Sequence, residues 1–574
     1  MRSPQEIRFR LRQEIGNLAL LAKAPRAPAM PSVLRKVAVE DLRGTEFERH
    51  LIAMADGLLA HRFPLLGVTI ETGPQIDWRR DYLHGVSTGL DYFRRVPYLD
   101  FARAGDHKVV WELNRHQHLV LLAQAWLLTG RREYLDEVFR QLASWMDANP
   151  FLRGINWASA LEVAFRALSW CWVSSLAGRD MPPELARRFA DELYRHGRFL
   201  ELNLSVYFSP NTHLLGEALA FYALGAAFGK ERWRREGARH VEEALRRQVR
   251  EDGSHFEQSA YYHVYALDFF LLYRVLANPG DWFDQRLVRM AEYLEALQGP
   301  SGVLPLLGDD DGGRLFHPYG DRLRFGRATL ATCAAMFGRW EWLRSPADLL
   351  EQAAWWIGAR GAPAAPRKSA QESRWFADAG TAVMAHEEIQ VVIKAGPFGE
   401  GSGGHSHSDV LSLVVRIGDR EVLIDPGTYT YIADPAERNA FRGSAAHNTV
   451  RIGNRDQAIP AGPFRWSEKP AVRLEAWEST ADRDVLDATC EYAGYRHRRR
   501  VEFRKAARRL RIQDHVEGPE WEQWWHLGSE EEEQRFRFES EAERVATWRS
   551  RALCSKERAV ALRTHSPTVE IDLQ

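Results

Sequence analysis

Apolar side chains recur every three or four residues between about residue 40 and residue 360. Clear examples are the stretches ALEVAFRALSWCWVSSLAG (160–178) and YALDFFLLYRVLA (265–277). This spacing gathers apolar side chains on one face of a helix, and Gly and Pro clusters separate the periodic stretches. We therefore expect residues 41–360 to form many helices joined by short loops, as in an (α/α) toroid or a helical bundle.

A shorter periodic stretch opens the chain. Its apolar positions at helical spacing are Ile7, Leu11, Ile15 and Leu18. They predict an amphipathic helix in an N-terminal arm over residues 1–40. The apolar run NLALLA is too short for a membrane span, and the acidic residues nearby do not fit a signal peptide. We expect no membrane span and a cytoplasmic protein, or a periplasmic one if an export signal was removed.

The pattern changes after the stretch GARGAPAAPRKSAQESR (358–374), whose Gly, Ala and Pro content predicts a linker at 361–374. Beyond it, β-branched residues alternate with polar ones in short segments such as EIQVVIKAG, VLSLVVRIG and HNTVRIG. Such segments between Gly or Pro turns predict an antiparallel β-sandwich over residues 375–574. Because helices come first and strands follow, we expect an α+β protein with two segregated domains.

Composition limits the partners. The chain has 574 residues, enough for two domains, with 77 Lys+Arg against 78 Asp+Glu and a net charge of -1. This balance argues against nucleic acid as the main partner, because phosphate binding favours a strongly basic surface. The four cysteines lie far apart without a CxxC pair, so neither a thiolate zinc site nor a disulfide framework is indicated.

The densest group of reactive side chains lies in GSGGHSHSDVLSLVVRIGDREVLIDPGTYTY (401–431) and FRGSAAHNTV (441–450). If HSHSD enters a strand, its period of two places His405, His407 and Asp409 on one face. Asp425 ends the next apolar segment and His447 begins a third.

Three neighbouring strands can therefore bring His407, Asp425 and His447 to one divalent ion. Two imidazoles and a carboxylate favour Zn²⁺ or Mn²⁺ over Ca²⁺, which prefers oxygen ligands alone. Structural, hydrogen-bonded histidines are the alternative. A metallohydrolase is disfavoured, because Val410 stands where the similar HxHxDH motif of metallo-β-lactamases has its third histidine.

Two segments of the helical half carry further candidates. In SPNTHLLGEALAFYALG (209–225), Asn211 and His213 stand at a helix start, where the amide can cap the helix or face a ligand. In EDGSHFEQSAYYHVYALDFFLLY (251–273), polar and aromatic side chains cluster ahead of an apolar helix. A phenol beside imidazoles there can exchange protons with a substrate, although core packing is the alternative. The clustered residues are Glu257, Tyr261, Tyr262, His263 and Tyr265.

An acidic run, GDDDGG, contains Asp309, Asp310 and Asp311, and we expect it to form a solvated turn. A toroid can also carry the paired carboxylates of a glycoside hydrolase. Candidates for that alternative are Glu162, Glu217, Glu257 and the acidic run. A protein that binds glycans without cleaving them, for example in exopolysaccharide assembly, is a third hypothesis.

Seven segments together resemble the heparinase II/III family of polysaccharide lyases. They follow the order WELNRHQHL (111–119), INWASALEVAFRALSW (155–170), SPNTHLLGEA, DGSHFEQSAYYHVYALDF, GGHSHSDVLSL, LIDPGTYTY and FRGSAAHNTV. The resemblance extends over nearly the whole chain. The resemblance implies an N-terminal (α/α) toroid, a C-terminal antiparallel β-sandwich, and a cleft that cleaves an acidic, uronate-containing polysaccharide by β-elimination.

The resemblance also implies roles for single residues. Tyr262 and His405 match the catalytic tyrosine and histidine. Asn211 and His213 match the pair that faces the substrate carboxylate, although Thr212 separates them here, whereas many relatives have them adjacent. His407, Asp425 and His447 match the metal ligands of several members. For substrate binding we expect contributions from Arg442, Glu257, Tyr261 and Tyr431.

The sequence leaves the polymer open among heparan, chondroitin, hyaluronan, alginate and a bacterial exopolysaccharide, because a fold does not fix a substrate. It also leaves open which of Tyr262 and His405 is the base. A free phenol has a pKa near 10 and imidazole one near 6.5, so His405 is the easier base at neutral pH.

Overall fold

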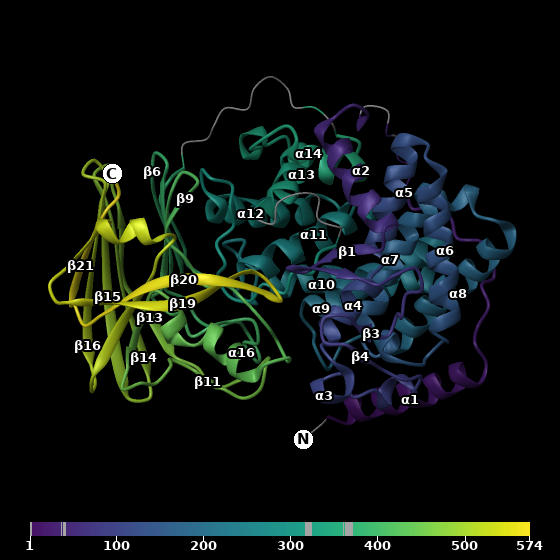
Figure 1. The fold of residues 1–574 in the computed structure, drawn as a ribbon, viewed down its shortest axis with the longest axis horizontal. Coiled ribbons are helices and arrows are strands. Elements are labelled where there is room, and N and C mark those ends of the chain that lie inside the picture. The colour runs from purple at the N-terminus through teal and green to yellow at the C-terminus, as the bar shows by residue number, and fades with distance from the viewer. Residues whose placement is uncertain are drawn as a thin grey trace.

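The protein has a helical lobe followed by a β lobe, as expected (Figure 1). The computed structural model describes residues 3–35, 37, 39, 42–315, 324–359, 361 and 371–574. Most of the predicted linker and the boundary between arm and toroid lie outside the described residues. Among the helices that the structure describes, none is long and apolar enough to cross a membrane.

Two kinds of helix alternate in the helical lobe. The inner helices are buried on nearly all sides: α5 (Gln117–Thr129), α7 (Ala160–Ala177), α9 (Thr212–Ala227) and α11 (Ala260–Ala277). The helices that follow α5, α7, α9 and α11 bury mainly one face: α6 (Arg132–Ala148), α8 (Pro183–Asn203), α10 (Glu231–Gln248) and α12 (Asp281–Gln298). A helix that packs against neighbours all round must be apolar all round. This pairing of inner and outer helices is the predicted (α/α) toroid.

Further helices complete the lobe. They are α2 (Glu46–Leu59), α3 (Phe101–Ala104), α4 (His107–Asn114), α13 (Arg327–Phe337), α14 (Asp348–Glu351) and α15 (Ala353–Trp356). Two short hairpins, β1 (Arg62–Leu65) with β2 (Val68–Glu71) and β3 (Arg80–Asp81) with β4 (Val86–Ser87), lie among them.

Helix α1 (Pro4–Ala22) forms where the apolar spacing predicted a helix, and the Ser3 side chain caps it by accepting from the Glu6 N–H. Its orientation is unexpected. It buries Gln13, Asn17 and Leu20, and Asn17 exchanges hydrogen bonds with Asn203 of α8. The predicted apolar stripe points outward instead, with exposed fractions of 55% at Leu18 and 68% at Ile15.

The β lobe consists of antiparallel sheets. One has five strands in chain order: β5 (Arg374–Phe376), β6 (Thr381–His386), β7 (Ile389–Lys394), β8 (Leu413–Ile417) and β9 (Arg420–Leu423). A second has the order β13 (Ala471–Ser479), β14 (Arg483–Tyr492), β15 (Tyr495–Arg504), β16 (Arg509–Glu517), β21 (Thr568–Asp572) and β18 (Phe536–Phe538). A third has the order β10 (Val450–Ile452), β17 (Trp521–His526), β20 (Ser555–Thr564) and β19 (Ala542–Ala552). Inward-facing side chains of these sheets share one apolar core, which confirms the predicted sandwich.

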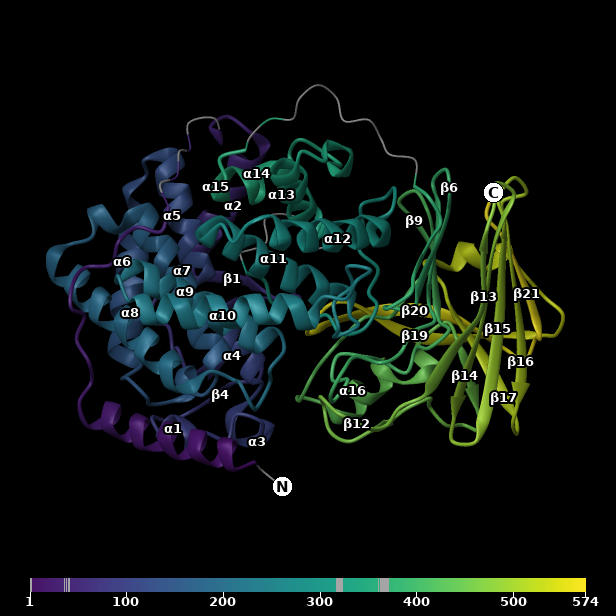
Figure 2. The same ribbon diagram turned by 180° about the vertical axis from the view of Figure 1, so that it is seen from behind.

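The long β19–β20 hairpin projects from the β lobe toward the helical lobe in both views (Figures 1 and 2). Near its tip, the Leu553 carbonyl accepts a hydrogen bond from the Gly67 N–H at 2.8 Å. A Cβ at position 67 would lie 2.7 Å from that oxygen, so the contact requires glycine. A second junction joins the Asp309 N–H to the His405 carbonyl at 2.9 Å. The candidate site forms at this second junction.

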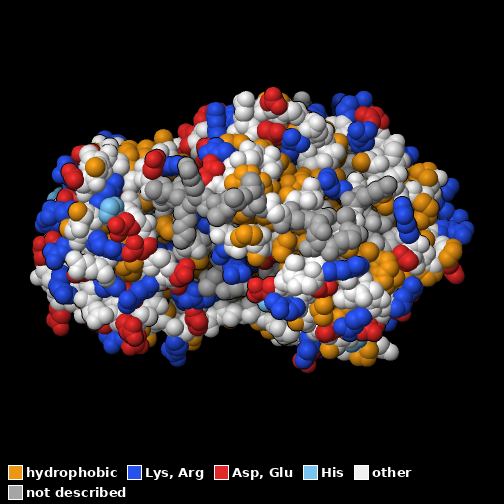
Figure 3. Space-filling model, turned by 90° about the horizontal axis from the view of Figure 1, so that it is seen from above, with side chains coloured by type: hydrophobic (Ala, Val, Ile, Leu, Met, Phe, Trp, Pro, Cys, Tyr) orange, Lys and Arg blue, Asp and Glu red, His pale blue; other side chains and the backbone are white. Residues whose placement is uncertain are grey.

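Acidic and basic side chains are interspersed on the face seen from above (Figure 3). This agrees with the near-zero net charge of the sequence.

Candidate functional site

The rings of Tyr262 and His405 are stacked, with centroids 3.8 Å apart and planes inclined by 22°. Tyr262 lies in the first turn of α11, which the Ser259 side chain caps by accepting from the Tyr262 N–H at 3.2 Å. His405 lies on the loop before β8. The structure therefore brings together two residues from different lobes that are each expected to exchange a proton with the substrate.

Asp309 lies at the centre of the site, and the predicted solvated turn is wrong. Asp309, Asp310 and Asp311 are all buried. Oδ2 of Asp309 accepts from His405 Nδ1 at 3.1 Å, and Oδ1 accepts from His407 Nε2 at 2.9 Å. Arg438 donates to both oxygens, at 2.5 and 2.8 Å.

Burial alone would raise the pKa of Asp309, but the charge of Arg438 and the hydrogen bonds from both imidazoles hold it well below its usual value. The carboxylate is thus ionised and can only accept hydrogen bonds. The sequence pattern concealed this role, because acidic residues beside glycines usually lie in exposed turns.

Asp311 occupies a matching position beside Tyr262. Its Oδ2 accepts from the Tyr262 hydroxyl at 3.2 Å and lies 3.1 Å from Lys108 Nζ. Burial would raise the pKa of Asp311, yet the charges of Lys108 and Arg115 hold it below its usual value. Burial, and then the negative charge of Asp311, raise the pKa of Tyr262 well above 10. Tyr262 is therefore a protonated phenol.

The Asn211 side chain has two partners. Its Oδ1 caps α9 by accepting from the His213 N–H at 3.1 Å, while Nδ2 donates to Glu257 Oε1 at 2.8 Å. Glu257 also lies 3.6 Å from His405 Nε2. Burial, and then the charge of His405, lower the pKa of His213 to about 4, so its ring is neutral at neutral pH. Asn211 therefore both caps α9 and contacts a residue of the site.

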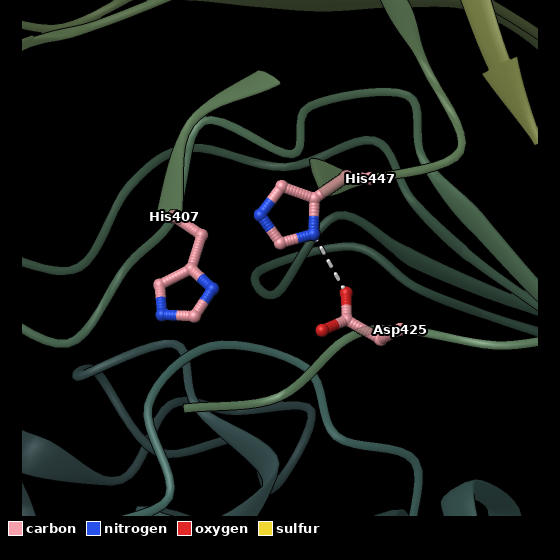
Figure 4. A group of neighbouring side chains, drawn as sticks. All are labelled: His407, Asp425 and His447. Carbon is pink, nitrogen blue, oxygen red and sulfur yellow. Dashed lines mark hydrogen bonds and ion pairs between the residues drawn. The ribbon is translucent and has the colours of Figure 1, made fainter. Parts of the chain in front are cut away.

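The three predicted metal ligands converge. One ligand atom from each of His407, Asp425 and His447 lies within 4.8 Å of the others, and all three residues are buried (Figure 4). His447 Nδ1 donates to Asp425 Oδ2 at 2.9 Å.

Within the described part of the chain, His407 Nδ1 and His447 Nε2 are buried without a hydrogen-bond partner. Buried nitrogens are ordinarily paired, so two such lone pairs beside a carboxylate fit a bound divalent cation.

The route to this convergence differs from the prediction. Residues 405–412 are not a strand, and β8 begins only at Leu413. Asp409 does not join the cluster either, because it forms a buried ion pair with Lys394 at 2.5 Å. The shared contacts with Asp309, and not strand periodicity, place His405 and His407 side by side.

The expected substrate-binding residues are spread more widely. The Tyr431 hydroxyl lies 3.5 Å from that of Tyr262, and Tyr261 packs its ring edge against Tyr262. Arg442 lies apart from the cluster: it is buried over Trp466, and its guanidinium donates to Asn439 Oδ1 and to the carbonyls of residues 462 and 463.

Arg438, one helical turn earlier in α16 (Pro435–Arg442), reaches the site instead. The sequence pattern did not indicate Arg438, and it indicated Asp309 and Asp311 only as a solvated turn or as carboxylates of a glycoside hydrolase. For Arg438, the i, i+4 spacing from Arg442 was the available signal.

Comparison with known families matches both lobes. Residues 35–312 match the family described as "Heparinase II/III N-terminus", and residues 368–574 match "Heparinase II/III-like, C-terminal". A curated relative, heparin-sulfate lyase of Pedobacter heparinus, is 26% identical over 428 residues, covering 69% of this chain and 59% of the relative. One from Bacteroides stercoris is 22% identical over 433 residues, covering 69% and 60%. The chain thus matches about three fifths of the length of these relatives.

Solved structures share the fold. Heparinase III has a TM-score of 0.69 at 17% identity, with 99% of this chain and 91% of that chain covered. Heparan sulfate lyase HepC from Pedobacter heparinus has a TM-score of 0.55 at 20% identity, with 98% and 88% covered. At identities this low, the similarity shows a shared fold, the toroid and the sandwich, and nothing further.

Proposed function

We propose that this chain, which belongs to the heparinase II/III family, is a polysaccharide lyase that cleaves a uronate-containing acidic polysaccharide by β-elimination. The observation that carries the proposal is the stacked pair of Tyr262 and His405, each held by its own ionised aspartate. Elimination needs one group that takes the C5 proton and another that protonates the departing O4. The pair supplies both.

His405 is the proposed base and Tyr262 the proposed acid. Because Asp309 can only accept, the His405 nitrogen facing it carries the hydrogen, so in the neutral ring Nε2 keeps the lone pair that takes the C5 proton. Burial would lower the pKa of His405, but the hydrogen bond to Asp309 and the charge of Glu257 raise it above its usual value, so His405 acts as the base once pH exceeds that raised pKa. Asp311 disfavours a phenolate at Tyr262, so the phenol is present to protonate O4. The electron pair of the C5–H bond forms the C4–C5 double bond as the C4–O4 bond breaks.

The proton on C5 is weakly acidic while the uronate carboxylate is charged, so donors must stabilise the enolate-like negative charge that develops on the carboxylate as C5 loses its proton. The proposed donors are Asn211 and the neutral ring of His213. In this arrangement Nδ2 of Asn211 exchanges its partner Glu257 for the substrate carboxylate.

Because the two reacting rings are stacked, one proton leaves C5 and another reaches O4 from the same face of the sugar. In glucuronate, H5 and O4 lie on the same face, whereas in iduronate they lie on opposite faces. The stack therefore favours glucuronate at the cleavage site.

His407, Asp425 and His447 are proposed to hold one divalent ion, with Zn²⁺ or Mn²⁺ favoured over Ca²⁺ by the two imidazoles. When bound, the ion supplies a fixed positive charge that anchors these three side chains. β-Elimination consumes no water, so the cluster is assigned to anchoring the loop that carries His405.

A screen of purified protein against uronate polymers tests the function. A lyase creates a double bond conjugated with the carboxylate, so ultraviolet absorbance rises as chains shorten. Chain shortening without new absorbance would show the glycoside hydrolase alternative, and binding without shortening would show the non-catalytic one.

The carboxylates proposed for a hydrolase are occupied otherwise. Glu162 forms a bidentate pair with Arg115, Glu217 accepts from Ser205, and Glu257 accepts from Asn211. The hydrolase alternative is not favoured.

A further inference from the structure

Two imidazoles with different proposed roles share the Asp309 carboxylate: His407 belongs to the metal cluster and His405 is the base. Each oxygen of Asp309 accepts from one histidine and from one nitrogen of Arg438, and Oδ1 also accepts from the Thr428 hydroxyl at 3.4 Å, so both oxygens are fully engaged. Asp309 reaches this position from the helical lobe, whereas both histidines and Arg438 belong to the β lobe.

The backbone around Asp309 is fixed as tightly as its side chain. Its N–H donates to the His405 carbonyl at 2.9 Å, and its own carbonyl accepts from the Ser259 hydroxyl at 2.7 Å. Ser259 caps the helix turn that carries Tyr262. A shift of the carboxylate would therefore move the histidines relative to Tyr262.

We infer that Asp309 is a positioning residue that couples the proposed metal cluster to the reacting histidine. By accepting from His407 Nε2, it leaves His407 Nδ1 bare toward Asp425 and His447. By accepting from His405 Nδ1, it leaves Nε2, which lies 3.6 Å from Glu257 Oε1, as the proposed base nitrogen. A carboxylate behind a metal-binding imidazole fixes its ring and tautomer, and here the same carboxylate fixes a second imidazole.

The inference rests on the proposed function, but part of its test needs no substrate. We compare Asp309→Asn with the matched control Asp310→Asn in the full-length protein. Asp310 is the adjacent buried acid, and its Oδ1 accepts from the Gly312 N–H, a bond that an amide oxygen keeps. The measurements are Co²⁺ affinity and visible spectrum, kcat and KM.

In Asp309→Asn, one oxygen becomes an amide nitrogen and cannot accept from an imidazole. We expect Co²⁺ affinity to fall by about 10-fold to 100-fold with an altered spectrum. We also expect kcat to fall by about 100-fold or more while KM changes little. Asp310→Asn should match wild type in all four measurements.

Loss of kcat with unchanged cobalt binding, or the reverse, would overturn the coupling. If wild type itself produces no unsaturated ends from any polymer, the proposed function fails, while the cobalt comparison still tests Asp309. If Asp309→Asn does not fold because Arg438 is left unpaired, the same measurements are made on the double variant Asp309→Asn/Arg438→Gln, which removes both charges.

Helix α1 packs on the toroid through Gln13 and Asn17 and exposes its apolar stripe, which consists of Ile7, Leu11, Ile15 and Leu18. Other large apolar side chains lie beside it. Phe9 of α1 contacts Tyr207, whose neighbour Phe208 is 71% exposed. Glu14 pairs with Arg94 at 2.5 Å, on a segment that also exposes Leu90 and Leu99.

Charge distinguishes between two occupants of this surface. Arg8 and Arg12 are exposed along one flank of the stripe. If two copies packed antiparallel through the stripe, this flank would face its own symmetry mate, and like charges would repel. An anionic bilayer accepts both the apolar stripe and the arginines.

We propose that the outward face of α1 binds the surface of an anionic membrane, lying in the interface without crossing it. The test is sedimentation of the full-length protein with phosphatidylglycerol/phosphatidylcholine vesicles and with phosphatidylcholine vesicles alone. Wild type should sediment with the anionic vesicles, and Leu11→Asp/Ile15→Asp should not.

The control Ile459→Asp, at an exposed apolar residue of the β lobe, should behave as wild type. Absence of vesicle binding by wild type would overturn the proposal. A wild-type dimer in light scattering that Leu11→Asp/Ile15→Asp converts to a monomer would assign the surface to a second copy instead.

Discussion

The site has a phenol half and an imidazole half, and each is built around one aspartate of the same acidic run. In the phenol half, Asp311 accepts from Tyr262 and is balanced by Lys108 and Arg115 of the helical lobe. In the imidazole half, Asp309 accepts from two histidines and is balanced by an arginine of the β lobe.

The difference shows how neighbours divide the work of identical carboxylates. Asp311 keeps its partner protonated, which suits an acid. Asp309 removes the hydrogen from neither histidine but dictates which nitrogen carries it, which suits a base.

The largest effect is expected in the phenol half. Tyr262→Phe removes only the hydroxyl that contacts Asp311, so the fold should persist while kcat falls by about 100-fold to 10,000-fold. The comparison variant is Tyr261→Phe, whose ring stacks on Tyr265 and Phe325; as a substrate-binding residue it should change KM and leave kcat near wild type. Near-normal kcat in Tyr262→Phe, with loss in Tyr261→Phe, would transfer the role to the neighbouring residue.

The imidazole half should divide into two functions. His405→Ala should retain the metal and the melting temperature but lose activity. His407→Ala should lose the metal, lower the melting temperature and reduce activity, because the cluster anchors the loop. Elemental analysis and thermal unfolding of both variants check this. A metal-free His405→Ala would make His405 a ligand, and a metal-free wild type would make the cluster a hydrogen-bonded structural one.

The pH dependence tests the phenol half more finely. An acid must stay protonated, and burial together with Asp311 raises the pKa of Tyr262, so this group should cause no loss of kcat/KM below about pH 10. Asp311→Asn removes the negative neighbour and leaves Lys108 and Arg115, so the alkaline loss should move to lower pH. If kcat/KM instead rose as Tyr262 ionised, Tyr262 would be the base.

The smallest effect lies outside the site. Burial raises the pKa of Glu217 from 4.5 to about 8. Folding therefore favours its protonated form, and the resulting destabilisation grows as pH rises between these two values. Glu217→Gln should have the melting temperature of wild type near pH 4 and a higher one at about pH 9. Urea unfolding at both pH values should show the same pattern in the free energy of unfolding. An equal difference at both pH values would contradict the shift.

The sequence predicted the fold through periodicity, because inner helices and sandwich strands bury apolar side chains at regular spacing. The family resemblance predicted that Tyr262, His405 and Asn211 share one site, and the spacing of His407, Asp425 and His447 predicted that they converge; the structure brings both groups together. The sequence could not predict the carboxylates that organise them. Asp309 becomes buried only through contacts with residues about a hundred positions later in the chain, and local composition indicates a solvated turn.

The direction in which α1 faces was equally hidden. A helical spacing of apolar residues predicts the helix, but the contact between Asn17 and Asn203 decides which face is buried. Tertiary contacts, and not the stripe, set the orientation.

The most direct test of the account compares two polymers that differ only in the configuration at C5 of the uronate. With the base and the acid stacked on one side, wild type should generate ultraviolet-absorbing unsaturated ends from the glucuronate polymer far faster than from the iduronate one. Faster elimination from the iduronate polymer would contradict the single-face arrangement of His405 and Tyr262.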